Sequence, residues 1–554
     1  MNARNYIQVI VPLKLDWEPV YSVPEGLEVA EGDRVIVIFS GKEYISVVSR
    51  TGVTPDPDLR EDSIHPILEK VIQLPPFSPR ELKFWRTMAS YYLCTVGEVY
   101  NSVYFRDRIA PKKWTAKDRS AITSEPILSP SQETVYHAAL DAFDVGKTVL
   151  LQGVSGSGKK EVYLKLAANT IRQGKSVLYL VPDISVSMAL EERVASVFPD
   201  VVPYHSGLTA AKRRDVILEA RTGNPLFVLG TRSALWIPFE KLGLIIVDQE
   251  QDSFYKQDSP APRYHTRETA IMLASIYGAK VILGSTCPSL ESIYNSETGL
   301  FIRLELNQRF NNSPEPEVML VDISAEKKKR GMSGSFSLKL LARLKDAVDA
   351  GKKALVICRA KAAVVEVREE VENIFPGALD KSIMLDTPFA VKTIPYGEYA
   401  VIAVLLADGL LGREDFRSDE RAMQMFTQLR GKTGLLVIQT KESRHPVFSQ
   451  AFADTLLAER KAVGYPPFTR MVKLELKDSD ENRQKLRARF LGNRIREVLR
   501  PFSDPLILGP EKGEIRIFFK RDKNLTAGKQ ALYKEVTSFE QQYSCHIIID
   551  VDPV

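Results

Sequence analysis

The sequence predicts a multidomain α/β protein, and three patterns along its 554 residues lead to that prediction. From about residue 128 to 300, apolar runs alternate with helical stretches, as expected for a parallel sheet that is buried on both faces. A glycine-rich stretch over residues 150–160 directly follows one of these apolar runs. Residues 446–554 carry strand-like and helix-like segments in the order β-α-β-β-α-β, which predicts a ferredoxin-like α+β domain.

Residues 1–105 are predicted to form a β-rich module. Apolar and polar residues alternate over 6–11 and again over 34–39, and turn-forming residues separate the two runs. Ser78 and Pro79 then supply an N-cap and a proline at the first helical position, so we expect a helix from Ser78 to Tyr92.

Residues 106–127 are predicted to be a basic linker. Six Lys or Arg and two Asp lie between Arg106 and Ser120, without clear helical or strand periodicity. Such a run is more often solvated surface than a DNA contact. The next unit is a first α/β lobe over 128–300, and residues 301–445 repeat the α/β pattern on a smaller scale, which predicts a second, companion lobe.

The composition is that of an ordinary globular chain, with 44% hydrophobic residues, 26% charged residues and a formal charge of +5. No apolar run reaches the roughly 18 residues that a membrane span needs, so we expect a cytoplasmic protein without a membrane partner. The four cysteines, Cys94, Cys287, Cys358 and Cys545, lie far apart. This spacing argues against a disulfide framework and predicts that no zinc is bound.

The glycine-rich stretch matches the P-loop pattern G-x-x-x-x-G-K through Gly153, Gly158 and Lys159, with Gly156 between them. In such a turn, backbone N–H groups converge on phosphates at the positive end of a helix, and the lysine reaches the terminal phosphates. A chance glycine-rich turn is the alternative, but the preceding strand, the spacing and the lysine all favour nucleotide binding, with ATP as the candidate.

The position after Lys159 departs from the P-loop pattern. A Ser or Thr hydroxyl normally ligates the magnesium ion there, but this sequence has Lys160. An ammonium cannot coordinate a cation, and two unit charges ~4 Å apart repel by about 4 kcal/mol at an effective dielectric constant near 20. Lys160 could turn to solvent or neutralise phosphate itself. Nucleotide binding therefore stays open, whereas ordinary magnesium-dependent hydrolysis is not expected.

A second candidate nucleotide-binding feature is an acidic cluster that follows the apolar run 242–247. In proteins with a P-loop, an aspartate at the end of such a strand helps to hold magnesium, and Asp248 stands at this position. The next residue would be a glutamate that activates water, but here it is Gln249. Loss of a positioned general base typically costs ~10²–10⁴ in rate. Glu250 is one residue further on and is predicted to project in a different direction, although we include it among the nucleotide-binding candidates. Asp248 and Glu250 could equally be polar residues at the end of a strand.

These residues belong to a longer series of motifs that resembles one family, the primosomal replication-restart DNA helicases of superfamily 2. The matching segments follow the family's order almost from end to end: Val11-Pro-Leu, Val23-Pro-Glu-Gly-Leu, Tyr91-Tyr-Leu-Cys-Thr-Val-Gly-Glu-Val, Leu180-Val-Pro-Asp-Ile, Gly230-Thr-Arg-Ser-Ala-Leu, Asp252-Ser-Phe-Tyr-Lys-Gln, Pro262-Arg-Tyr-His-Thr-Arg, Gly284-Ser-Thr-Cys-Pro-Ser-Leu-Glu-Ser, Asp415-Phe-Arg, Gly464-Tyr-Pro-Pro-Phe and Asp550-Val-Asp-Pro. The resemblance implies a domain that binds the 3′ end of DNA, followed by two RecA-like lobes.

The resemblance also implies DNA-contacting residues, namely Tyr21, Arg232, Phe254, Tyr255, Lys256 and Arg263. Phe254 and Tyr255 could stack on bases, at roughly 1–3 kcal/mol each, or could anchor a packed loop. In the N-terminal module, Val20 stands where an acidic residue is expected beside the terminal nucleotide, and Asp16 could substitute for it.

The sequence departs from the family at several points. The family's winged-helix domain has no counterpart in 106–127, and its eight-cysteine, two-zinc module is absent from the second lobe. The fifth helicase motif is missing around Tyr399. Lys432 and Leu435 replace two arginines of the last helicase motif, and neither offers the bidentate guanidinium that would meet charge on a phosphoryl group.

These departures favour a DNA-binding replication-restart protein whose helicase scaffold has lost ATP hydrolysis and unwinding. Two alternatives remain, an active ATP-dependent 3′–5′ DNA helicase and an ATP-binding switch that does not hydrolyse. The partners that the resemblance implies are forked, 3′-ended or single-stranded DNA, primosome or helicase-loading proteins, and single-stranded DNA-binding protein.

Overall fold

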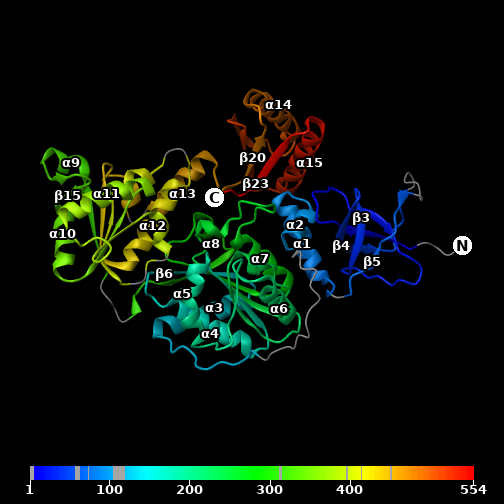
Figure 1. Cartoon of the computed structure of the whole chain (residues 1–554), viewed down its shortest axis with the longest axis horizontal. Helices are drawn as coiled ribbons and strands as arrows, with labels where there is room; N and C mark the ends of the chain where they lie inside the picture. Colours follow the sequence, from blue (N-terminus) through cyan, green and yellow to red (C-terminus); the bar gives the residue numbers. More distant parts are fainter. Residues whose placement is uncertain are drawn as a thin grey trace.

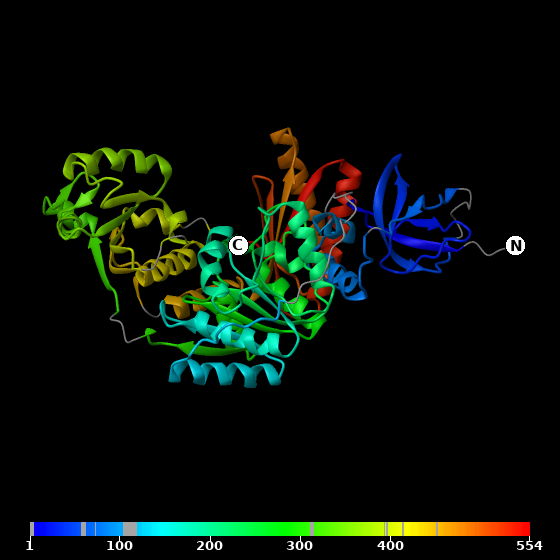
Figure 2. The ribbon, with the colours of Figure 1, turned by 60° about the horizontal axis from the view of Figure 1, so that its bottom comes forward.

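The computed structural model describes residues 5–56, 63–72, 74–103, 119–310, 315–392, 394, 397–412, 415–449 and 452–554. Residues 106–118 of the predicted basic linker (106–127) lie outside these ranges. Four larger β-sheets follow one another along the chain. The N-terminal domain and the second parallel sheet lie at opposite ends of the molecule, with the first parallel sheet and the C-terminal domain between them (Figures 1 and 2).

The N-terminal domain is an antiparallel sheet of five strands followed by two helices, of which the sequence predicts a β-rich module and the first helix. Its strand order is β2-β1-β4-β3-β5. The elements are β1 (Tyr6–Ile10), β2 (Val20–Ser22), β3 (Arg34–Phe39), β4 (Lys42–Thr51), β5 (Glu69–Lys70), α1 (Pro79–Tyr92) and α2 (Val96–Val103). The predicted start of α1 is confirmed by a capping box. The Ser78 side chain accepts from the backbone N–H of Glu81, and the Glu81 carboxylate accepts from the backbone N–H of Ser78.

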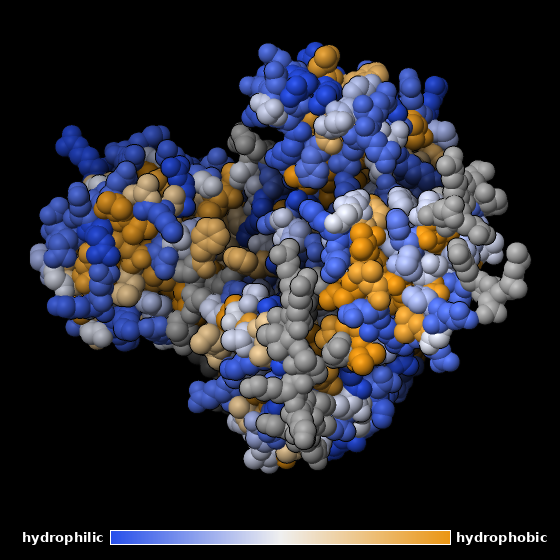
Figure 3. All heavy atoms as spheres, turned by 45° about the vertical axis from the view of Figure 1, so that its right-hand side comes forward, coloured by the Kyte–Doolittle hydropathy of each residue, from blue (hydrophilic) through white to orange (hydrophobic). Residues whose placement is uncertain are grey.

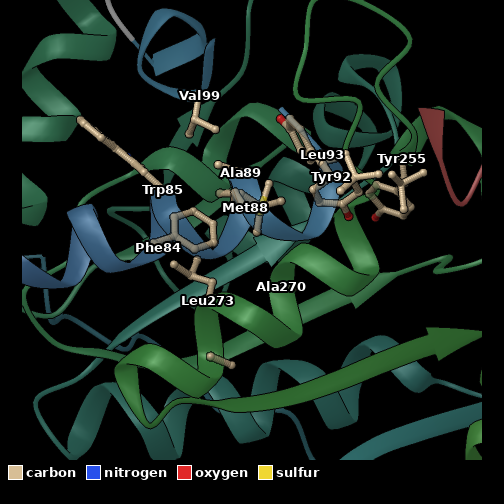
Figure 4. Close-up of a cluster of buried hydrophobic side chains, with 14 of the residues drawn as sticks. Phe84, Trp85, Met88, Ala89, Tyr92, Leu93, Val99, Tyr255, Ala270 and Leu273 are labelled. Atoms are coloured by element: carbon tan, nitrogen blue, oxygen red, sulfur yellow. The ribbon is translucent and has the colours of Figure 1, made fainter. Parts of the chain in front are cut away.

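Helix α1 of the N-terminal domain packs against the first lobe (Figure 4). Phe84 and Met88 of α1 are buried in the same cluster as Ala270 and Leu273 of α7 (Thr266–Tyr277). At the end of α1, the Tyr92 hydroxyl accepts from the backbone N–H of His265 at 3.1 Å. The two domains thus share one hydrophobic core.

The first lobe is a seven-stranded parallel sheet in the order β12-β6-β11-β10-β7-β9-β8, which confirms the predicted parallel α/β arrangement. Its strands are β6 (Thr148–Gly153), β7 (Ser176–Leu180), β8 (Val202–Tyr204), β9 (Phe227–Gly230), β10 (Leu242–Asp248), β11 (Lys280–Ser285) and β12 (Phe301–Leu306). Besides α7, its helices are α3 (Pro130–Asp144), α4 (Lys159–Arg172), α5 (Ile184–Ala195), α6 (Ala210–Ala220), α8 (Leu290–Glu297) and the 3₁₀ turns η2 (Arg232–Trp236) and η3 (Ser253–Tyr255). Strand β12 pairs with β6, so this sheet continues beyond residue 300, where the sequence predicts its end.

The second lobe is a parallel sheet of five strands in the order β13-β19-β18-β16-β17. Its strands are β13 (Glu317–Asp322), β16 (Lys353–Ile357), β17 (Ile383–Asp386), β18 (Tyr399–Val404) and β19 (Thr433–Thr440), with a small hairpin of β14 (Met332–Ser333) and β15 (Phe336–Ser337). Its helices are α9 (Ile323–Lys328), α10 (Leu338–Asp349), α11 (Lys361–Ile374), α12 (Ser418–Lys432), α13 (Phe452–Val463) and the turns η5 (Pro388–Lys392), η6 (Ala407–Leu410) and η7 (Pro446–Phe448). Phe452 and Leu456 of α13 belong to this lobe's core, so the lobe extends past residue 445.

The C-terminal domain is a four-stranded antiparallel sheet in the order β21-β22-β20-β23, covered by two long helices. Its elements follow in the predicted order: β20 (Thr469–Lys477), α14 (Glu481–Leu499), β21 (Leu506–Glu511), β22 (Glu514–Lys520), α15 (Leu525–Tyr543) and β23 (His546–Val551). No helix among the described residues is long and apolar enough to cross a membrane.

Candidate functional site

The P-loop lies between the end of β6 and the start of α4, as its sequence predicts. Gly156 and Gly158 both have φ of +79°, a left-handed conformation that glycine adopts without a steric cost. A Cβ atom at Gly158 would also lie 2.0 Å from Nε2 of Gln132, so a larger residue does not fit there. Gly158 caps α4 without a side-chain hydrogen bond, and the positive end of the helix therefore faces the loop.

Lys159 is folded over the loop. Its Nζ donates to the carbonyl oxygens of Gly153 at 2.7 Å and Val154 at 3.3 Å. Burial lowers the pKa of Lys159 to about 8; the negative charge of Asp248 opposes this shift, and the positive charge of Lys160 adds to it. An anion in the loop would stabilise the charged form of this ammonium.

Lys160 is exposed at the start of α4. Asp248, at the end of β10, is only 4% exposed, and its Oδ2 accepts from the hydroxyl of Tyr179 at 3.2 Å. Gln249 follows in a left-handed conformation with φ of +55°. Within the part of the chain that the structure describes, no group of three or more His, Cys, Asp or Glu side chains is placed to hold a metal ion.

Glu250 lies in a different environment from Asp248, although two positions separate them. It is completely buried, and its Oε1 accepts from the backbone N–H of Ser289 at 2.7 Å. Its Oε2 accepts from the hydroxyls of Ser289 and Ser292 and from Arg267, at 2.8–2.9 Å. These donors occupy both carboxylate oxygens at the start of α8, so the structure places Glu250 in a buried network and not in the P-loop.

This buried network continues into the second lobe. Glu291 of α8 pairs with Arg417 at 2.8 Å. Burial alone would raise the pKa of Glu291, but Arg417, Arg267 and Arg460 together lower it. Glu420 of α12 accepts from the backbone N–H of Leu290 at 2.9 Å and pairs with Arg460 at 2.7 Å. The start of α8 is therefore held by carboxylates from both lobes.

The predicted DNA-contacting residues separate into exposed and buried ones. Phe254 is 44% exposed, and Arg263 is half-buried. Arg232 is also half-buried, and its guanidinium donates to the carbonyl oxygen of Phe254 at 2.9 Å. Tyr255 is fully buried, and its hydroxyl lies within hydrogen-bonding distance of two backbone carbonyls, those of Leu180 and Asp248.

Lys256 and Tyr21 are also buried. The Lys256 ammonium pairs with Asp550 at 2.7 Å and donates to the backbone carbonyl of Val551 at 2.6 Å. It therefore joins the loop after β10 to the last strand, β23. The Tyr21 hydroxyl donates to the backbone carbonyl of Ile38 at 2.8 Å inside the N-terminal domain. Asp16 accepts from the hydroxyl of Tyr533 on α15 at 2.8 Å. As placed here, neither Lys256 nor Tyr21 presents its polar group at the surface.

In the second lobe, the end of α12 touches the P-loop. A Cβ atom at Gly431 would lie 2.3 Å from Cβ of Ser155. The neighbouring Lys432 ammonium donates to the carbonyl oxygens of Val391 and Ile394, at 2.5 and 2.9 Å. Leu435 lies within β19, where it is paired with strands on both sides. The structure thus brings Lys432 near the P-loop but places Leu435 inside the sheet.

One residue that the sequence analysis missed supports the P-loop directly. The Gln132 amide Nε2 donates to the carbonyl oxygen of Ser157 at 2.9 Å, and Gln132 also closes a capping box with Ser129. The pattern Ser-x-x-Gln at the start of a helix is readable from sequence. The contact between Gln132 and Ser157, 25 residues apart, cannot be predicted from that pattern.

Two parts of the chain match known domain families. Residues 8–104 match the 3′DNA-binding domain (3'BD) of PriA, and residues 129–295 match the DEAD/DEAH box helicase family. Among solved structures, the chain is similar to RecG bound to a three-way DNA junction, with 14% identity and a TM-score of 0.43. That similarity covers 68% of this chain and 52%, about half, of the solved one.

Similarity to whole proteins extends over nearly the entire chain. The chain is 25% identical to Replication restart protein PriA of Rickettsia felis, over 96% of this chain and 97% of that protein. It is 27% identical to Replication restart protein PriA of Bacillus subtilis, over 82% of this chain and 69% of that protein. Together, the matched 3′DNA-binding domain, the matched helicase domain and this chain-long similarity support a PriA-like replication restart helicase.

Proposed function

We propose that this chain is a DNA-binding replication-restart protein that recognises forked or 3′-ended DNA and has lost ATP hydrolysis and unwinding. The observation that carries the proposal is the combination, in one chain, of a matched 3′DNA-binding domain with a P-loop in which Lys160 takes the place of the metal-ligating hydroxyl. A protein of this kind would mark a DNA structure for partner proteins. Primosome or helicase-loading proteins and single-stranded DNA-binding protein are the proposed partners.

The proposed domains are the 3′-end module (1–105), the linker (106–127), the first helicase lobe (128–300, extended by β12), a trimmed second lobe (301–445, extended by α13) and a ferredoxin-like domain (446–554). The strand order β21-β22-β20-β23 supports the ferredoxin-like assignment. Two observations support trimming. Only three residues separate β16 from α11, where the family carries its zinc module, and the R. felis alignment spans 646 residues, more than this chain contains.

Loss of hydrolysis is supported in both lobes. Lys160 offers no lone pair to a metal, and Gln249 cannot accept a proton from water. In the second lobe, Leu435 is uncharged and the Lys432 ammonium is bonded to backbone carbonyls. ATP would supply phosphoryl-transfer energy if it were hydrolysed. The chain's own residues would hold its phosphates through the loop of Gly153, Gly156 and Gly158 and through Lys159. An active helicase is the alternative, and a non-hydrolysing ATP-dependent switch is a second one.

DNA contact is proposed for exposed surfaces only. Phe254 is 44% exposed and would stack on a base, and the half-buried Arg232 and Arg263 border the same loop. The C-terminal domain adds two exposed arginines, Arg489 on α14 and Arg500 directly after it, and the surface at the top of Figure 3 is mainly hydrophilic. Tyr21, Tyr255 and Lys256 are left out of the proposed contact surface because their side chains are buried.

The test is a pair of measurements on the full chain. Binding to forked, 3′-tailed and blunt duplex DNA is measured over a salt series, and ATP hydrolysis is measured with and without the fork. We expect tighter binding to the fork than to the blunt duplex, an affinity that falls steeply with salt, and turnover at background. Equal affinity for fork and blunt duplex would contradict recognition, and fork-stimulated hydrolysis would contradict loss of the motor. Elemental analysis is expected to find no stoichiometric zinc.

A further inference from the structure

Three lysines from two lobes gather at the P-loop. Lys159 and Lys160 begin α4, and Lys432 ends α12, whose neighbouring Gly431 touches Ser155 of the loop. Burial and, to a smaller extent, the positive charge of Lys160 lower the pKa of Lys432 to about 8. So much positive charge in one place is unfavourable unless an anion balances it.

Local carboxylates do not balance Lys160. Glu161 is the acidic residue of the same helical turn, but it pairs with Arg193 of α5. Among the described residues, no carboxylate lies within 4.0 Å of the Lys160 ammonium. Asp248 acts on Lys159, and its Oδ2 already accepts from Tyr179. The charge of Lys160 is therefore available to a ligand.

A buried hydroxyl inside the loop also lacks a partner. Ser157 is 3% exposed, and its Oγ makes no hydrogen bond within the described protein. This Oγ lies 2.7 Å from the point where a Cβ of Gly153 would stand, which places it within the turn of the loop. A buried hydroxyl without a partner costs about 1–3 kcal/mol, and a phosphate oxygen entering the loop would supply an acceptor. This observation is independent of the lysines and also indicates an anionic ligand.

A magnesium ion does not fit this arrangement. The hydroxyl that should ligate it is replaced by the Lys160 ammonium, which has no lone pair to give and would repel the cation. We propose that the P-loop of this chain binds the polyphosphate of a nucleotide without a magnesium ion, with Lys160 supplying the positive charge that the metal supplies elsewhere. The proposal goes beyond DNA recognition and does not depend on it.

The test measures ATP binding to the full chain by calorimetry, once with excess magnesium and once with excess EDTA. We expect the wild-type chain to bind ATP at least as tightly in EDTA as in magnesium. Lys160→Thr restores the hydroxyl, and it should reverse this order, binding at least about tenfold more tightly with magnesium than without it. Lys160→Met removes the charge at similar length and should weaken binding in EDTA by about tenfold. Inorganic triphosphate, used in place of ATP, separates recognition of the polyphosphate from recognition of the nucleoside.

Lys175→Met is the matched control, because this exposed lysine lies past the far end of α4 and should leave binding unchanged. Fork binding of each variant is measured in parallel, so that a failure of DNA recognition is distinguished from a failure of the nucleotide proposal. A wild-type chain that binds ATP only with magnesium, or binds neither ATP nor triphosphate, would overturn the proposal. So would a Lys160→Met variant with wild-type affinity in EDTA.

Discussion

The two acidic residues at the end of β10 have opposite environments, although they are only two positions apart. Asp248 faces the P-loop, where we propose that Lys160 and Gln249 stand in place of the residues that would complete a metal site and a general base. Glu250 faces α8, where four hydrogen bonds satisfy its carboxylate completely. Protein donors thus occupy both oxygens of the Glu250 carboxylate, whereas Asp248 accepts from the Tyr179 hydroxyl beside the P-loop.

The end of this strand therefore serves two purposes, the stability of the fold at Glu250 and the chemistry of the site at Asp248. The Glu250 side connects α7, α8 and the second lobe, so a change there would leave a charge buried without a partner. On the side of Asp248, substitutions at Lys160 and Gln249 alter the chemistry of the site but should not unfold the loop. The loop is held by Gln132 and by the left-handed conformations of its glycines. We therefore expect the fold to tolerate substitutions at Lys160 and Gln249, but not at Glu250 or its partners.

The largest expected effect concerns repair of the Asp248 side. The double variant Lys160→Thr, Gln249→Glu should gain magnesium-dependent ATP binding but remain about 10³–10⁵ slower in DNA-stimulated hydrolysis than an active helicase. The second lobe offers no arginine fork at these positions, because Leu435 is uncharged and the Lys432 ammonium is bonded to backbone carbonyls. Hydrolysis is measured with forked DNA. Brisk turnover would show that the second lobe is intact and that two substitutions alone inactivate the chain.

Disrupting the Glu250 side should cost stability. Arg267→Met leaves Glu250 charged and buried without the guanidinium that pairs with it, and should lower the free energy of unfolding of the first lobe by about 3–5 kcal/mol. Urea unfolding followed by tryptophan fluorescence measures this loss. Arg303→Met, which removes an exposed pair with Glu305, is the control and should cost less than about 1 kcal/mol. Equal losses in the two variants would contradict the comparison.

The next prediction contrasts neighbours of opposite exposure in the loop after β10. Phe254→Ala should weaken single-stranded DNA binding by roughly 1–3 kcal/mol, because its ring is partly exposed and would stack on a base. Tyr255→Phe should leave that affinity unchanged and instead lower stability by about 1 kcal/mol, since it loses a buried hydroxyl hydrogen bond. DNA titrations and urea unfolding of both variants are the measurements. A DNA-binding defect in Tyr255→Phe would require the loop to rearrange.

The smallest effect is a pH dependence of the metal-free nucleotide site. The pKa of Lys432 is lowered to about 8, so its ammonium is charged at pH 7 and largely neutral at pH 9. ATP affinity in EDTA should therefore fall as pH rises through this window, by about threefold or less for one partly screened charge. Lys159 titrates in the same range, so Lys432→Met should reduce the pH dependence without abolishing it. An unchanged pH profile in this variant would place Lys432 outside the site.

The sequence predicted the elements that are specified by neighbouring residues, such as helix caps and apolar runs. The capping residues Ser78 and Pro79 identified the start of α1, and the apolar runs identified the central strands of the first lobe. Strand β12 was missed because it lies at the sheet edge and mixes exposed charges with apolar residues. The burial of Tyr255 and the partners of Glu250 were also not predictable, since they depend on contacts with Leu180 and Ser289, which are far away in sequence.

The bond between Glu420 and the backbone N–H of Leu290 has a consequence for motion between the lobes. The donor belongs to the first lobe and the acceptor to the second, and both are buried. Separating them by a few ångströms breaks the bond before water can replace it, at about 1–3 kcal/mol, and the adjoining Glu291–Arg417 pair would separate in the same movement. Small rotations are therefore unfavourable, whereas a full opening lets water solvate the freed groups. The lobes should consequently move between two discrete arrangements, with a barrier between them, rather than flex continuously.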